Sequence, residues 1–178
     1  MRYVALLAAP LALLTAQPAF AGASAEALAC PAKNAPAGLA NSLGTAIVTG
    51  DKDSPAAKNV MASLRALTDL CLEQHKIPVA QAEAYAAYVF DAIMLGELTR
   101  RLTASGVPVD ALDEGLGFGP GRPNVPIEKV EQSHLDKMTA SLKARGYDLN
   151  KAPEEVIRLI GMYIGARSGL AMDVAALK

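Results

Sequence analysis

The stretch from Pro78 to Ala104 constrains the fold most, because it has helical character and no polar face over its middle. Between Ala84 and Gly96, apolar side chains point in every direction at the 100° per residue of an α-helix. They are Tyr85, Tyr88, Val89, Phe90, Ile93, Met94 and Leu95. Such a helix is either buried in a core or spans a membrane. Charged residues interrupt the stretch too often for a span of about 20 apolar residues. The sequence therefore predicts a buried central helix over 78–104.

Residues 1–21 have the pattern of a secretory signal peptide. Arg2 precedes an apolar run from Val4 to Ala16, and Ala19-Phe20-Ala21 supplies small residues for cleavage. We expect cleavage after Ala21 and residence in the periplasm or outside the cell. The remaining 157 residues (178 minus 21) suffice for one domain, 22–178, with a core of its own. This part contains neither a transmembrane pattern nor a basic patch, so we expect no nucleic-acid partner.

Helical periodicity and helix-start signals recur on both sides of the central helix. Four further helices are expected: from Leu39 to Gly50, from Pro55 to about His75, from Pro126 to Arg145, and from Pro153 onward. Proline at the first helical position favours three of these starts. The segments 22–38 and 106–125 are predicted to be largely irregular. The fold class is therefore an all-α, single-domain bundle of about five helices around the central one.

Cys30 and Cys71 are the two cysteines of the chain. In an oxidising compartment an isolated pair most simply forms a disulfide. Leu28-Ala29-Cys30 faintly resembles a lipidation site, so acylation of Cys30 is the alternative, although the leucine stands one place too close to the cysteine.

Asp91 is the one carboxylate within the apolar part of the central helix. A buried carboxylate is costly unless it is paired or hydrogen-bonded. Arg167 falls in the apolar arc of the last helix and is the natural candidate partner, so we expect a partly buried Asp91–Arg167 ion pair. A functional carboxylate with a raised pKa is the alternative for Asp91.

Small residues suggest two further features. Gly161, Gly165 and Gly169 lie four apart and predict a close packing seam on the last helix. The glycine-rich segment 115–123 contains Phe118 and Arg122, an aromatic and an arginine suited to contacting a partner protein.

Glu131 and His134 have the Glu-x-x-His spacing that forms half of a di-iron site in helical bundles. No second copy of the motif is present, so the pair is a weak metal candidate and a local Glu–His hydrogen bond is the preferred interpretation. We expect no metal or other cofactor.

Catalytic motifs for nucleophilic, zinc or haem chemistry are absent from the sequence, and we assign no catalytic residue. The preferred hypothesis is a non-enzymatic exported binding module, as a single chain or an oligomer, whose partner is a cell-envelope protein or a toxin. The alternatives are a carrier with an apolar ligand in its helical core, and a carboxylate- or metal-dependent enzyme using Glu131, His134 and Asp91.

Overall fold

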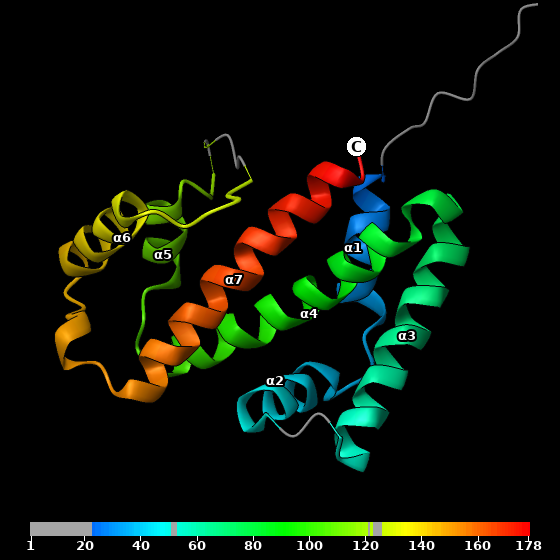
Figure 1. Ribbon diagram of the computed structural model, residues 1–178, viewed down its shortest axis with the longest axis horizontal. Helices are drawn as coiled ribbons and strands as arrows, with labels where there is room; N and C mark the ends of the chain where they lie inside the picture. Colours follow the sequence, from blue (N-terminus) through cyan, green and yellow to red (C-terminus); the bar gives the residue numbers. More distant parts are fainter. Residues whose placement is uncertain (1–22, 51–52, 121, 123–125) are drawn as a thin grey trace, which may run out of the picture.

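The computed structural model describes residues 23–50, 53–120, 122 and 126–178, and this part of the chain forms seven α-helices and no strands (Figure 1). The helices are α1 (Ala25–Asn34), α2 (Leu39–Thr49), α3 (Pro55–His75), α4 (Ala82–Ala104), α5 (Val109–Leu116), α6 (Gln132–Ala144) and α7 (Glu154–Ala176). Short 3-10 turns precede α4 (η1, Val79–Gln81) and α7 (η2, Leu149–Lys151). The all-α prediction is confirmed. The predicted signal peptide lies outside the described residues.

Helix α4 runs through the middle of the molecule, as predicted. It crosses α7 on one side and packs against α1, α2 and α3 on the other (Figure 1). Helices α5 and α6 form a lobe beyond α7 (Figure 1). The buried residues of α4 surround the helix and include Tyr85, Val89, Leu98 and Leu102. Its first predicted turn is the 3-10 turn η1. None of the helices in the described residues is long and apolar enough to cross a membrane.

Helix α1 was not predicted, and its stability depends on contacts with α4. Pro31 lies inside α1 and cannot donate a backbone hydrogen bond to the carbonyl of Ala27, four residues earlier. The Tyr85 hydroxyl donates to that carbonyl instead, at 2.6 Å, and both residues are buried. The neighbouring Tyr88 hydroxyl donates to the Leu28 carbonyl. The central helix thus supplies the hydrogen bond that proline removes.

We expect Tyr85→Phe to lower the free energy of unfolding by about 2 kcal/mol, because it leaves the buried Ala27 carbonyl without a donor. Tyr88→Phe is the matched control. Its acceptor, the Leu28 carbonyl, keeps the backbone N–H of Ala32 as a donor, so the loss should be smaller. Urea unfolding followed by circular dichroism measures both, and equal losses would contradict this role of Tyr85.

The C-terminal half of α4 is joined to α2 through Arg101, which also pairs with the buried carboxylate of Glu97. The Glu97 side chain is only 3 % exposed. It accepts hydrogen bonds from Arg100 and Arg101, which hold the pKa of the Glu97 carboxyl below its usual value. Arg101 also donates to the Thr45 hydroxyl on α2. A Cβ at Gly44 would lie 2.7 Å from Glu97 Cγ, so glycine lets α2 approach this cluster.

Helices α5 and α6 pack directly on each other and form the lobe. Their closest approach is at Gly115, where a Cβ would overlap the backbone of Met138. The segment 106–125 was predicted to be largely irregular, but its residues 109–116 form a complete helix because Ala111, Leu112 and Leu116 bury an apolar face. Helix α6 begins at Gln132 rather than at Pro126, and residues 126–131 lead into it without helical structure.

The predicted glycine seam on α7 is wrong for two of its three residues. A Cβ at Gly161 or Gly165 would meet no atom within 4 Å, and both positions are exposed. Only Gly169 faces a neighbouring helix, where a Cβ would overlap the Asp91 carboxylate. Helix α7 continues through all three glycines to Ala176.

Candidate functional site

The predicted disulfide is present. Cys30 in α1 and Cys71 in α3 are joined at an S–S distance of 2.03 Å, and both residues are almost fully buried. The bond fixes α1 against the C-terminal half of α3. Its buried position and its role in joining two helices identify it as structural.

The predicted ion pair between Asp91 and Arg167 is wrong. Arg167 Nε donates to Asp113 Oδ1 at 3.0 Å, and the Tyr163 hydroxyl donates to the same oxygen at 2.8 Å. The geometry of α7 explains the difference. Residues two apart point about 200° apart around a helix, so a helix that turns Gly169 toward Asp91 turns Arg167 away from it.

Asp91 lies half-buried between α4 and α7 with no hydrogen bond or ion pair among the described residues. Burial, and then the negative charge of Asp173, raise the pKa of Asp91 to about 6. Burial also raises the pKa of Asp173, whose Oδ2 is buried and accepts no hydrogen bond from any described residue. Two unpaired carboxyl groups thus destabilise this interface when both are ionised.

We expect Asp91→Asn to stabilise the protein at pH 7. The folded pKa of Asp91 lies above its ordinary value of 3.8, so the folded state binds more protons between about pH 3.8 and 6. The Asp91 carboxyl group therefore lowers the free energy of unfolding as the pH rises through that window. The asparagine variant should be more stable at pH 7 by about 1 kcal/mol after allowance for solvent screening.

Thermal unfolding of the wild type and Asp91→Asn from pH 4 to pH 7.5, followed by circular dichroism, measures this effect. The melting temperature of Asp91→Asn should exceed that of the wild type by an amount that grows with pH and levels off above about pH 6. Glu128→Gln, at an exposed position ahead of α6, is the control and should show no such trend. A variant that is less stable than the wild type at pH 7 would contradict the interpretation.

Phe118 and Arg122 do not form the predicted partner contact together. Phe118 is 1 % exposed, and the Arg167 guanidinium covers its ring at 4.7 Å from the centroid. The backbone N–H of Phe118 donates a hydrogen bond to the Asp113 carbonyl and so caps the C-terminus of α5, just after Gly117. Arg122 is exposed and pairs with Glu114 at 2.9 Å. The aromatic residue therefore belongs to the core.

Glu131 and His134 lie at the start of α6. His134 Nδ1 accepts a hydrogen bond from the backbone N–H of Glu131 at 3.1 Å, so one of its two ring nitrogens is occupied by helix capping. Within the described residues, no group of three or more histidine, cysteine and acidic side chains could hold a metal ion. Asp91 does not belong to this cluster, because it lies between α4 and α7.

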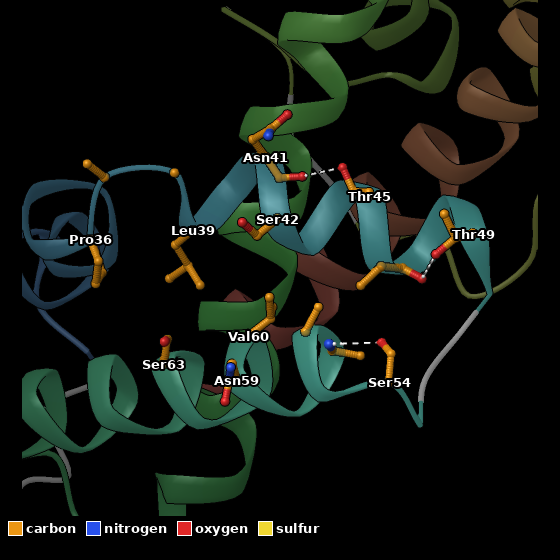
Figure 2. Close-up of a pocket in the computed structure, with 15 residues that line it drawn as sticks. Pro36, Leu39, Asn41, Ser42, Thr45, Thr49, Ser54, Asn59, Val60 and Ser63 are labelled. Carbon is orange, nitrogen blue, oxygen red and sulfur yellow. Dashed lines mark hydrogen bonds between the residues drawn. The ribbon is translucent and has the colours of Figure 1, made fainter.

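A cleft lined by several serine, threonine and asparagine residues together with apolar ones separates α2 from the start of α3 (Figure 2). Its volume is about 640 Å³, and none of the described residues that line it is charged. Leu39 points from α2 toward α3 in the view of Figure 2. The hydroxyls of Thr45 and Thr49 donate to carbonyls of their own helix, and Ser54 caps α3. Much of the hydrogen-bonding capacity of the cleft is thus used within the fold.

A more apolar groove of about 850 Å³ lies between α3 and α4. The two helices diverge from their connection at η1 (Figure 1). Alanines line both sides: Ala62 and Ala66 on α3, and Ala82 and Ala86 on α4. Larger apolar side chains complete the lining: Met61, Leu64, Leu72 and Phe90. Met61 is 54 % exposed, so the groove presents apolar surface to solvent. We call this surface the α3–α4 groove.

Three charged residues border the α3–α4 groove: Arg65 and Asp69 on α3, and Glu83 on α4. None of them forms an ion pair with another described residue, and all three are exposed. Arg65 precedes Asp69 by four residues, and this order of base before acid gives a weaker ion pair within a helix than the reverse order. The groove thus combines apolar lining with unpaired charges of both signs.

Sequence reasoning missed this groove because Met61 continues the apolar stripe of α3 and reads as a core residue. A usable signal was present in the spacing of the alanines. Ala62 and Ala66, and likewise Ala82 and Ala86, are four apart and mark one helix face with short side chains.

Comparison of this chain with protein-family models, with curated proteins and with solved structures finds no match. The geometry of the described residues is therefore the basis for the function proposed below.

Proposed function

We propose that this protein is a non-enzymatic binding module of the periplasm or another oxidising compartment, and that it binds a helix of a protein partner in the α3–α4 groove. The observation that carries the proposal is the groove itself. It lies between two helices that diverge from η1, with short side chains along both sides and exposed apolar surface. Grooves of this kind accept the apolar face of an amphipathic helix.

The chemistry of the groove supports a helix as the occupant. Alanine side chains let another helix backbone approach closely, and Met61 is a flexible side chain that adapts to the contacting surface. Arg65, Asp69 and Glu83 at the border can pair with charges on the partner. A buried disulfide suits a module that functions where thiols are oxidised.

The two alternative functions have less support. The residues offered for an enzyme lie apart, since Asp91 is between α4 and α7 while Glu131 and His134 cap α6. A carrier needs an apolar ligand held within the helical core, whereas the α3–α4 groove is bordered by exposed and charged residues. We therefore favour a binding surface over an interior site.

Site-specific photo-crosslinking in the cell that exports the protein tests the proposal. A benzophenone amino acid replaces exposed Ala66 in the groove or, as a control, exposed Lys137 on α6. We expect one discrete crosslinked adduct from position 66 and none from position 137. Met61→Glu combined with Ala86→Glu should abolish the adduct, because charges then occupy the apolar lining. Absence of an adduct at position 66, or an adduct that survives this double change, would refute the proposal.

A further inference from the structure

We infer that the occupant of the α3–α4 groove is a second copy of this chain, docked through α3 in an antiparallel, two-fold symmetric pair. This inference rests on the proposed function and names its partner. It follows from the arrangement of charges on the exposed face of α3, which is complementary to itself only when the two helices run in opposite directions.

The charges on this face of α3 are segregated along the helix. Lys58 and Arg65 lie in its N-terminal half, and Asp69 and Glu73 lie in its C-terminal half. All four are exposed, and none forms an ion pair within the described residues. A parallel neighbour would place like charges together. An antiparallel copy places the positive half of each α3 against the negative half of the other.

One register satisfies the central charges. A two-fold axis at the level of Leu67 sets position 65 of one copy opposite position 69 of the other, because these positions are equally distant from residue 67. Arg65 then faces Asp69 twice, once in each direction. Lys58 falls within about one helical turn of Glu73 of the other copy at a rise of about 1.5 Å per residue. Lys76, the exposed C-cap residue just past the end of α3, lies at the level of Lys58 of the other copy, so the outer positions contribute less than the central Arg65–Asp69 pairs. The symmetry uses the same patch on both partners, as a closed dimer requires.

The same register also matches the apolar residues. Met61 of one copy lies about one residue, roughly 1.5 Å along the axis, from the level of Leu72 of the other. Ala62 and Ala66 stand between these contacts and allow the helices to approach closely. The exposed thioether of Met61 would thus be covered by the groove of the second copy, in which Leu72 is a lining residue.

Charge exchange tests the inference on the purified, exported protein with its disulfide intact. Sedimentation equilibrium should show a dimer for the wild type. Arg65→Asp and Asp69→Arg should each raise the dimer dissociation constant roughly tenfold or more, because each creates two like-charge pairs. An equimolar mixture of these two single variants should dimerise again, because both pairs become opposite in sign. The double variant Arg65→Asp/Asp69→Arg should also dimerise. Lys137→Asp on α6 is the control and should leave the dimer unchanged.

The outcomes separate this inference from the proposed function. A monomeric wild type at about 100 μM, or single variants that dimerise like the wild type, would overturn the second-copy inference. The photo-crosslink at position 66 then decides the groove proposal. An adduct of twice the chain mass supports both proposals. An adduct of any other mass that Met61→Glu/Ala86→Glu removes supports the groove and refutes self-association. No adduct refutes both.

Discussion

Replacing both Cys30 and Cys71 by serine should lower the free energy of unfolding by about 4 kcal/mol, which is the chain-entropy value for the loop closed between residues 30 and 71. The reason is that the unfolded chain regains the freedom that the bond removes. In addition, α1 would lose its covalent attachment to α3, while its hydrogen bonds from Tyr85 and Tyr88 would remain. The melting temperature should fall by roughly 10 °C or more.

Thermal and urea unfolding with and without a reducing agent measure this effect. The wild type under reducing conditions should approach the stability of the double serine variant, and the variant itself should not respond to the reductant. A loss below about 1 kcal/mol would show that the bond contributes little beyond what the α1 contacts already provide.

Asp113→Ala should destabilise the protein by about 3 kcal/mol, because it removes the shared partner of two partly buried groups. Asp113 accepts from Arg167 and from Tyr163, whose side chains come from successive turns of α7. Arg167 would keep its contact with the Phe118 ring but lose its counter-charge. The buried Tyr163 hydroxyl would lose its acceptor. Glu128→Ala, at an exposed position ahead of α6, should change stability by less than about 0.5 kcal/mol.

Native-state hydrogen exchange adds a second measurement for Asp113→Ala. Asp113 joins α5 to α7, so amides of the α5–α6 lobe should lose protection to a greater extent than amides of α3 and α4. Uniform loss across the molecule would indicate that the lobe and the rest of the fold unfold together, which would contradict the anchoring role assigned to Asp113.

The sequence predicted those helices whose apolar pattern and end signals lie within the helix itself or in the residues next to it. The interval Pro55–His75 has a capping serine, a proline at its first position and a regular apolar stripe, and it was predicted at both ends. The end of α4 at Ala104 was also predicted, since glycine and proline follow closely. Helix α1 was missed because its sequence contains Pro31, and the compensating hydroxyl of Tyr85 lies 58 residues away in the chain.

The site residues illustrate the same limit. The disulfide could be predicted because the chain has only two cysteines. The partner of Arg167 could not, because its choice between Asp91 and Asp113 depends on how α7 is rotated against two different helices. Phe118 was assigned to the surface from its glycine-rich surroundings. In the structure, the turn at Gly117 directs the ring back under α7, and no local pattern encodes that packing.

The position of the disulfide has a consequence for the order in which this protein can be assembled. Both sulfurs lie before α4, so a chain that emerges N-terminus first exposes residues 30 and 71 before the last hundred or so residues have appeared. With two cysteines, only one intramolecular pairing exists. An oxidant acting at that stage would therefore close the correct loop even before its final packing forms. The tyrosines of α4 would then dock onto an α1 that is already tethered, and the second half of the molecule would fold on a preassembled first half.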